Sequence, residues 1–597
     1  MQADQTQDMN SRVVMALTGA LAGFSVWLMS EVLHELISNQ HVFLFVVASI
    51  SGFFGTLLAL CGPVSILRAA PAAAGLALVT ATLFSWASLR HAEIDPFLEH
   101  GYGIVAWLVA LSIATPFVAV WLEDRNAWRN YAELFDVTWT IVVRYAAAWL
   151  FVAVFWGVVF LSNALFEIVG ISIIEDFLDI EGVPYVLSGL TLGLALSVVY
   201  ELRDYVSPFL ILRLMRLLIP VVLVVIAVFI AALPFRGLSG LFGDLSAGGT
   251  LMAMAIGGIT LITTALDRDD EAAISMRVMR LATQALALLL PVLGVLAFWA
   301  VSLRIQQYGW TPNRMAAAAA AALIGVYAFL YAVAVLWQMF GIATKGAGDW
   351  MARIRRANVV MALVIVGLSL LWLSPVLNGE RISARSQVAR YMAGEAKADQ
   401  LPLWEMAHRW GTAGQDALTT LAAIENEDQK TLTDLIEKAQ STSSIYAYNR
   451  ASTNTKFSNG IAILRANLTV IPSNIVLGED VFAEVNYFHG LKDWEWTCKD
   501  AVAPGCVLFI ADLDSLNTGK EGFIFRPYVP TGSAFIAERI TFTNDRVRKS
   551  GGYLLNPETR QRMQFSTDEM KQLVAGDYRI APSSSNSLWL GDVELDP

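Results

Sequence analysis

Charged residues are scarce in this 597-residue chain, at 16% of the sequence, whereas a soluble domain carries about 25%. Hydrophobic residues make up 56%, and the mean hydropathy is +0.54. This composition excludes a wholly water-soluble protein, because so many apolar residues need lipid as a solvent. The formal net charge of −11 excludes nucleic acid as a sensible partner, since a nucleic-acid binder needs a basic surface.

Several motifs of enzymes and pumps are also missing. The sequence contains no phosphate-binding GxxxxGK[ST] loop, no zinc-binding HExxH, no GxSxG nucleophile turn and no haem-type CxxCH. No Asp, Glu or Lys lies clearly in the middle of an apolar segment, which argues against a proton-driven pump with a carboxylate relay. The sequence therefore favours a protein that is not an enzyme and holds no cofactor or metal.

Eleven long apolar segments are present instead. A bilayer core about 30 Å thick needs about 20 apolar residues per helix. The predicted spans are Val13–Glu31, Val42–Leu60, Ala69–Leu89, Gly103–Trp121, Trp139–Leu161, Val186–Leu202, Leu217–Leu233, Gly249–Leu266, Ala282–Leu303, Met315–Phe340 and Asn358–Leu377. The short sixth and seventh spans could be tilted, kinked or partly re-entrant. The predicted fold is mainly α, a polytopic transmembrane helical bundle of about 11 spans over residues 1–377.

Lys and Arg in the short loops predict the orientation. With a cytoplasmic N-terminus, fourteen of these residues fall in cytoplasmic loops and four on the other side, Arg90, Arg236, Arg304 and Arg314. We therefore expect the N-terminus in the cytoplasm and the tail on the outer side of the membrane, although one miscounted span would reverse the tail. The first eleven residues are not basic, so the first span reads as a retained anchor. Arg144, near the start of the fifth span, is expected to snorkel to the cytoplasmic side.

The polar tail divides in two. Residues 378–440 contain helix-spaced apolar residues, and RISARSQVAR just after the last span is a basic amphipathic start that can lie on the membrane surface. Residues 441–597 are β-rich, with strands expected in GIAILRANLTVI, CVLFIADL, GFIFRPYV and SAFIAERITF. The tail is therefore predicted to be an extracytoplasmic helical segment followed by a β-rich domain, together a C-terminal soluble α+β domain.

Only three cysteines are present, and two of them are close together in the tail. Pro and Gly between Cys498 and Cys506 allow a hairpin disulfide, which would contribute about 2–3 kcal/mol of stability and would need an oxidising compartment such as a periplasm. Two unpaired thiols, or two of four metal ligands, are the alternatives. Cys61 lies at a membrane boundary and is expected to be inert.

The turn RIQQYGWTPNR joins the ninth and tenth spans on the expected outer side. Thr311 and Pro312 are a typical N-cap and first residue of a helix, and Tyr308 and Trp310 suit the membrane interface. Two of the four outward arginines flank the turn, which suggests carboxylate or lipid-phosphate partners. The residues of this possible binding motif are Arg304, Tyr308, Gly309, Trp310, Thr311 and Arg314; a well-capped turn with interfacial anchors is the alternative.

This segment resembles a bacterial family of polytopic inner-membrane proteins described only as a domain of unknown function. The family pattern Arg-Ile-x-x-Tyr-Gly-x-Thr-x-x-Arg falls on Arg304, Ile305, Tyr308, Gly309, Thr311 and Arg314. The resemblance covers most of the membrane part and implies an inner-membrane location and a multi-span fold. It implies no established activity, so no catalytic residue is carried over.

Acidic residues and histidines gather at the expected outer ends of the spans. Glu31, His34 and Glu35 share a helix face by their spacing, and His41 starts the second span. With His91, Glu93, Asp95, Glu99 and His100 of the next outer loop they could hold a Zn²⁺-like ion, but solvated loop ends are the favoured interpretation.

Two further segments are rich in carboxylates. EIVGISIIEDFLDIEGV has five carboxylates and no basic residue, and it is expected to form a short interfacial helix whose carboxylates face the Arg304–Arg314 turn, attract cations or, as we favour, remain in water. ADLDSLNTGKEG (Ala511–Gly522) departs from the spacing of a calcium loop, so a polar hairpin turn is favoured there.

Three functions remain open. The first is a permease-like or lipid-handling protein, which predicts a cavity lined by spans. The second is a cell-envelope scaffold or sensor that binds a partner protein through the periplasmic domain. The third is a membrane transferase using lipid-linked donors, with Glu31 and Glu35 as its only candidate acids. Membrane lipids are expected partners in all three cases, and the sequence leaves the oligomeric state open.

Overall fold

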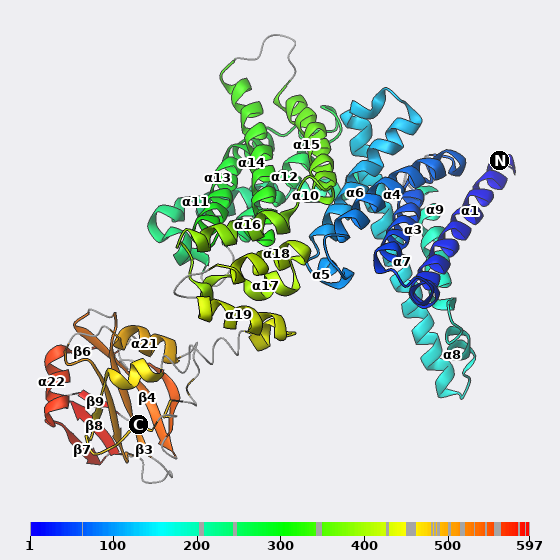
Figure 1. Ribbon diagram of the computed structural model, residues 1–597. Helices are drawn as coiled ribbons and strands as arrows, with labels where there is room; N and C mark the ends of the chain where they lie inside the picture. The colour runs from blue at the N-terminus through cyan, green and yellow to red at the C-terminus, as the bar shows by residue number, and fades with distance from the viewer. Residues whose placement is uncertain are drawn as a thin grey trace. The chain divides into compact units, whose positions relative to one another are not determined.

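A computed structural model describes residues 2–62, 64–201, 208–242, 247–341, 349–424, 429–448, 461–478, 481–482, 485, 490–499, 503–513, 520–529, 532–543, 546–553, 563–582, 586–590 and 593–595. The chain forms two compact units, Met1–Gln440 and Ser441–Pro597, which are described separately (Figure 1). Part of the polar hairpin expected at Ala511–Gly522, residues 514–519, lies outside the described residues.

Among its described residues the first unit contains eleven helices that are long and apolar enough to cross a membrane, so the predicted fold class and span count are confirmed. They are α1 (Gln2–Trp27, continued by η1 Leu28–Leu33 and α2 His34–Leu36), α3 (Gln40–Leu60), α4 (Ile66–Ser88), α6 (Tyr102–Glu123), α7 (Tyr131–Ile168), α9 (Val183–Glu201), α10 and α11 together (Pro208–Arg216 and Ile219–Phe242), α12 (Ala247–Leu266), α13 (Arg277–Tyr308), α14 (Pro312–Met339) and α15 (Trp350–Leu373).

The spans in the structure are longer than predicted, and the seventh and fifth show this in different ways. The seventh covers 24 residues, Leu212–Phe235, instead of the short segment expected, and it is interrupted at residues 217–218 just before Pro220. Proline favours a helix start because it lacks the N–H that an interior position would donate. The fifth, α7, has 38 residues and is therefore about 57 Å long, much more than a bilayer core requires.

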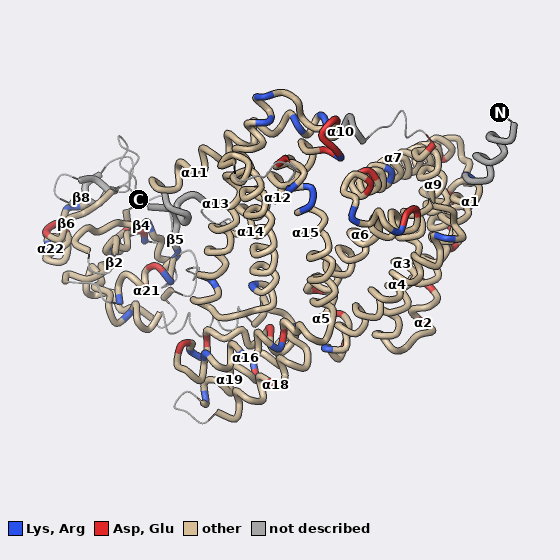
Figure 2. The backbone as a smooth tube through the Cα atoms, turned by 90° about the horizontal axis from the view of Figure 1, so that it is seen from above, with Lys and Arg blue, Asp and Glu red and all other residues tan. Residues whose placement is uncertain are grey.

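The membrane helices form two bundles with separate cores. The N-terminal bundle, α1 to α9, buries Leu60, Ala148 and Leu196 among others, and the C-terminal bundle, α10 to α15, buries Leu251, Leu290 and Trp350. Helix α15 packs against α14 and also against α6 of the N-terminal bundle. Figure 2 shows α10–α15 on one side of the unit and α1–α9 on the other, with α15 and α6 next to each other.

Helices α1 and α9 approach through glycines. A Cβ on Gly19 would lie 2.1 Å from the carbonyl oxygen of Gly189, and a Cβ on Gly193 would lie 2.2 Å from that of Met15. The sequences GALAG and GLTLG place these glycines four residues apart, the small-residue spacing that lets membrane helices come close. An ion pair between Arg12 and Glu201 joins the same two helices at their end.

The two ends of the membrane unit are named here face I and face II. Face I carries the start of the first span and the segments around Cys61 and Asp267, and face II carries Arg90, Tyr308 and α16–α19. Short helices at face II are α5 (Ile94–Glu99), α8 (Ile173–Leu178), α16 (Gly379–Met392), α17 (Leu403–His408), α18 (Gly411–Ala422) and α19 (Gln429–Ser441); short 3₁₀ turns are η2 (Ala127–Arg129) at face I and η3 (Ala398–Gln400) at face II.

Arg144 corrects one expectation. Its side chain is buried rather than extended into solvent: it donates to the carbonyl oxygen of Cys61 over 2.8 Å, and its guanidinium lies 5.1 Å from the ring centre of Tyr200. The guanidinium reaches towards face I, where groups of α3 and α9 surround it in place of water. Cys61 is buried and unpaired.

The second unit is an α+β domain. Its larger sheet has the order β1-β2-β3-β4-β5, with β6 paired to β4, and its smaller sheet has the order β7-β8-β9. The strands are β1 (Leu468–Ile471), β2 (Cys506–Ala511), β3 (Lys520–Pro527), β4 (Ala534–Thr543), β5 (Arg546–Tyr553), β6 (Phe565–Ser566), β7 (Arg579–Pro582), β8 (Asn586–Leu590) and β9 (Val593–Leu595), and the helices are α21 (Lys492–Cys498) and α22 (Thr567–Ala575).

Both faces of the larger sheet are buried. Leu508, Ile510 and Ile524 belong to one core, and Phe509 and Phe523 to the other, as the alternation of side chains along a strand requires. The predicted strand GIAILRANLTVI is only half right, because residues 461–466 are helical and only β1 follows them. Ile461 and Leu464 of that helical turn are buried in the first of these cores. Cys498 and Cys506 form a disulfide between the end of α21 and the start of β2, as predicted.

Candidate functional site

The turn between α13 and α14 is fixed by its own side chains. The hydroxyl of Thr311 accepts from the backbone N–H of Arg314 over 3.3 Å, and Pro312 is the first residue of α14, so the expected helix start is present. The Arg314 guanidinium donates back to the carbonyl oxygens of Tyr308 and Gly309, over 3.0 and 2.8 Å. The local part of the motif is therefore a capped turn closed by an arginine.

The same turn is the docking point of α16. The Gln387 amide donates to the carbonyls of Tyr308 and Trp310, both over 2.9 Å, and Arg390 donates to Gln307 over 2.9 Å. Gly309 has a φ of +72°, and a Cβ there would lie 2.6 Å from Cδ of Arg390. Glycine is needed twice over, for the backbone conformation and for the close approach of α16.

Three arginines converge on this turn. The guanidinium carbons of Arg304 and Arg314 lie 5.8 and 5.3 Å from the centre of the Tyr308 ring, and Arg390 reaches the turn from α16. The only carboxylate described in contact with the three is that of Glu395, 3.8 Å from Arg390 and 66% exposed. The carboxylates around α8 (Glu167, Glu175, Asp176, Asp179 and Glu181) are exposed and make no described contact with these arginines.

The predicted acidic and histidine cluster does not assemble. Glu31, His34 and Glu35 are exposed, while His41 hydrogen-bonds Ser88 over 2.9 Å. Residues Leu28–Leu33 form a π-helical turn, whose wider winding disturbs the spacing that places the three on one α-helical face. Within the part of the chain that the structure describes, no three His, Cys, Asp or Glu residues are grouped to hold a metal ion.

The other residues of that predicted cluster, in the loop from His91 to His100, mostly form contacts that hold neighbouring segments together. His91 is buried and hydrogen-bonds the carbonyl of Arg409 over 3.0 Å, while Glu99 pairs with the Arg409 side chain over 3.6 Å. His100 hydrogen-bonds the carbonyl of Pro96. Burial lowers the pKa of His91 below its ordinary value, against the opposing effects of the Arg409 carbonyl and the Glu380 charge.

Arg90, another of the four arginines expected on the outer side, connects three elements. It donates to the carbonyls of Trp372, Ser374 and Leu377, over 3.3, 2.6 and 3.1 Å, and lies 3.4 Å from the Glu380 carboxylate. Its own carbonyl accepts from the N–H of Thr412. A single guanidinium therefore connects the end of α4 to the end of α15 and the start of α16.

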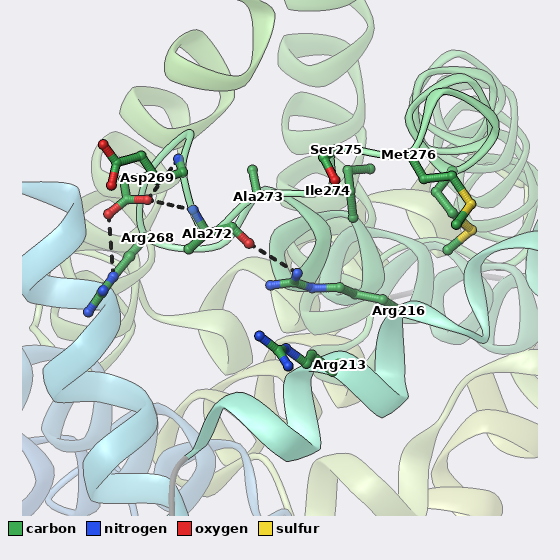
Figure 3. Close-up of a pocket in the computed structure, with 11 residues that line it drawn as sticks. Arg213, Arg216, Arg268, Asp269, Ala272, Ala273, Ile274, Ser275 and Met276 are labelled. Carbon is green, nitrogen blue, oxygen red and sulfur yellow. Dashed lines mark hydrogen bonds and ion pairs between the residues drawn. The ribbon is translucent and has the colours of Figure 1, made fainter. Parts of the chain in front are cut away.

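Face I has a feature that the sequence analysis missed, an open cleft of about 510 Å³ in the C-terminal bundle. Arginines and carboxylates form one part of its wall, and apolar side chains form another (Figure 3). Arg213 and Arg216 of α10 lie beside each other below the segment from Ala272 to Met276. The full lining is Arg213, Arg216, Arg268, Asp269, Glu271, Ala272, Ala273, Ile274, Ser275, Met276 and Met279.

Buried charges support the cleft from behind. Asp267 is 1% exposed and pairs with Arg216, whose Nε also donates to the carbonyl of Thr264 over 2.8 Å. Arg355 of α15 donates to the carbonyl of Leu266 and to the Asp270 carboxylate, both over 2.6 Å. Asp269 accepts the backbone N–H groups of Glu271 and Ala272, which closes the loop on itself.

A sequence signal for this loop exists. Residues 267–271 read DRDDE, a run of five charged residues in an otherwise apolar region. Arg268 is one of the fourteen Lys and Arg residues that predict the orientation, and the other four residues of the run carried no prediction. The pairing of the loop with Arg216 and Arg355 is not visible in the sequence, because these residues are 51 and 88 positions away from Asp267.

The fold defines the class of the protein: a multi-pass membrane protein with a C-terminal α+β domain. Comparison with models of known protein families found no match for the chain, and searches of curated proteins and of solved structures found none either. The resemblance of the Arg304–Arg314 segment to a family of unknown function stays a prediction.

Proposed function

We propose that the protein is a permease-like or lipid-handling protein of the bacterial inner membrane, and that the cleft at face I receives an amphiphile with a charged headgroup. The amphipathic wall of the cleft carries the proposal. The guanidinium groups of Arg213 and Arg268 give one part of the wall a charge that attracts a headgroup, whereas Ile274, Met276 and Met279 offer apolar contact to a chain. A volume of about 510 Å³ lies within the roughly 300–1,000 Å³ of ordinary ligand sites.

The division of the membrane unit into two bundles is consistent with this proposal. Each bundle has its own core, and α15 packs against both of them. At face I the exposed pair of Arg268 and Asp136, 3.2 Å apart, joins the rim of the cleft to α7. Transporters that work by alternating access move one such bundle against the other.

The orientation belongs to the same proposal. Face I, with the larger share of Lys and Arg, is cytoplasmic, and face II and the C-terminal unit are periplasmic. The disulfide of Cys498 and Cys506 supports this, because disulfides persist in oxidising compartments. A reporter fused after Leu377 should be active only as a periplasmic fusion; cytoplasmic activity would reverse the assignment.

The proposal can be tested with a substitution that fills the cleft. Ser275 lines it and is exposed, so Ser275→Trp should occupy the space without disturbing the buried pairs. Native mass spectrometry of the purified full chain with phosphatidylglycerol or phosphatidylethanolamine should show a bound lipid whose occupancy falls at least fivefold in Ser275→Trp and severalfold in Arg213→Gln. The matched control is Arg356→Gln, an exposed arginine of face I outside the cleft. Equal lipid occupancy in all four proteins would overturn the proposal.

A second candidate, a cell-envelope scaffold or sensor, is favoured by one observation. The C-terminal unit has two cores of its own and a cavity of about 250 Å³ beside β2. In that case a tagged full-length chain should retrieve one defined envelope protein that a variant lacking residues 441–597 does not. For the transferase alternative, Glu31 and Glu35 are exposed and line none of the described cavities.

A further inference from the structure

We infer that the three arginines around Tyr308 form a binding site for a phosphate group at face II. The site consists of Arg304 at the end of α13, Arg314 in the first turn of α14 and Arg390 on α16. It is separate from the cleft at face I and does not depend on transport. The phosphate is that of a lipid headgroup or a free phosphate ion, which share the same chemistry.

The geometry places the three guanidinium groups on one turn. Arg304 and Arg314 both lie over the Tyr308 ring, at 5.8 and 5.3 Å, and Arg390 donates to the carbonyl of Gln307, one residue before it. Two of the three are held in place by backbone carbonyls, so the cluster is built before any ligand arrives. Ligands gain affinity from such preorganised donors.

The charge of the cluster is poorly compensated by the described residues. A backbone carbonyl orients a guanidinium but does not cancel its charge, and the one nearby carboxylate, Glu395, is largely exposed. Arg304 makes no described hydrogen bond or ion pair, and its side chain is exposed beside Tyr308. Like charges held together raise the affinity for an anion, and guanidinium groups match phosphate oxygens in pairs.

Helix α14 adds to the same potential. Its 28 residues begin at Pro312, directly at the cluster, and the N-terminal end of a helix carries a partial positive charge. On Arg314 only Nη1 is described as donating to the turn, so further N–H groups of the fork remain to face a ligand. The helix and the arginines therefore both favour a negatively charged ligand.

The location favours a lipid as the source. Arg304 lies four residues before the end of a membrane-length helix, and Tyr308 is 49% exposed, as tyrosines at membrane interfaces are. Beside it, α16 packs its Ser383, Gln387 and Tyr391 side inward and leaves Arg385 and Met392 exposed. A helix with exposed basic and apolar side chains at the end of a membrane bundle is suited to the headgroup layer.

The experiment uses Arg304→Gln, because Arg304 makes none of the described contacts that hold the turn together. The purified full chain in nanodiscs of phosphatidylglycerol should be more stable to heat than in nanodiscs of phosphatidylcholine, and native mass spectrometry should retain a phosphatidylglycerol whose occupancy falls at least threefold in Arg304→Gln. The matched control at face II is Lys430→Gln, an exposed cation on α19. High salt should weaken the retained lipid.

A second arm separates the two sources. Millimolar inorganic phosphate that stabilises the detergent-purified protein, but not Arg304→Gln, supports the site and identifies a free ion as its ligand. Retention of phosphatidylglycerol with no effect of phosphate supports it and identifies a lipid. No preference for the anionic lipid, no effect of phosphate and unchanged behaviour of Arg304→Gln would overturn the inference. Loss of the face I lipid in Ser275→Trp affects neither arm, so the two proposals fail separately.

Discussion

The arginines at the two faces of the membrane unit have different hydrogen-bonding partners. At face I arginines meet carboxylates: Arg355 lies 2.6 Å from Asp270, Arg280 lies 2.5 Å from Asp349, and Arg216 pairs with the buried Asp267. At face II arginines mainly meet backbone carbonyls, as Arg90 and Arg314 do. The ion pairs described at face II are longer, at 3.4 to 3.8 Å.

This difference shows that arginines have two roles in this protein: one is to hold the structure together in ion pairs, and the other is to leave a positive charge at the surface. The buried carboxylate of Asp267 neutralises Arg216 and fixes a loop, so this charge pair of face I should break at a high cost in stability. A carbonyl fixes an arginine without neutralising it, so face II keeps positive charge that an anion can meet. The predictions below test this contrast, starting with the largest expected effect.

Removing the Asp267 carboxylate should lower the stability of the protein more than any other change proposed here. Asp267→Ala leaves Arg216 buried without its carboxylate, which should lower the free energy of unfolding by about 3–5 kcal/mol in chemical or thermal denaturation of the purified protein. Asp267→Asn keeps the shape of the side chain and tolerates the positive φ of 51°, so this variant should lose less stability than Asp267→Ala. If Asp267→Ala lost under 1 kcal/mol, buried pairing would not be what stabilises face I.

The turn at face II should be sensitive to a single methyl group. Gly309→Ala should destabilise the contact with α16 by more than the roughly 1–3 kcal/mol of backbone strain, because the new Cβ would also lie 2.6 Å from Arg390. Gly394→Ala is the matched control: its φ is +73°, but no atom lies within 4 Å of the new Cβ. Protease sensitivity at α16 and thermal stability should both separate the variants; equal losses would rule out the close approach.

A lower pH should reduce the stability of the protein through His91 at face II. Its folded-state pKa is lowered, so the unfolded state binds a proton more readily, and stability falls as the pH drops below the ordinary value near 6.5. One proton changes the free energy of unfolding by at most about 1.4 kcal/mol per pH unit. Arg90, Glu380, His100 and Arg409 are the charged or titratable groups that act on it. Thermal unfolding between pH 7.5 and 5.0 should lose part of its pH dependence in His91→Gln, but not in a variant of the exposed His34.

The smallest effect is expected at the exposed pair of Arg268 and Asp136. Both side chains are about half exposed, so Arg268→Gln should change the free energy of unfolding by only about 0.2–1 kcal/mol. A double-mutant cycle with Asp136→Asn should give a coupling energy in the same range, which high salt removes. A coupling above 2 kcal/mol would mean that this pair, and not α15, is the main link between the bundles.

Sequence reasoning succeeded where the signal was local. The helix start at Thr311 and Pro312 was predicted because a cap and its helix lie within four residues, and the disulfide because Cys498 and Cys506 are eight positions apart. It failed for the helical turn at residues 461–466, whose apolar residues suit either a strand or a buried helix. It also missed the pairing of Asp267, because its partner Arg216 belongs to another helix.

The sequence by itself determined the eleven spans and the change to an α+β domain, because the number of apolar residues in a window decides whether a helix dissolves in lipid. Only the tertiary structure decided which group each arginine meets. Partners such as Arg90 and Glu380, 290 positions apart, are brought together by helix packing, on which local sequence has little influence. The candidate sites at both faces are therefore products of that packing.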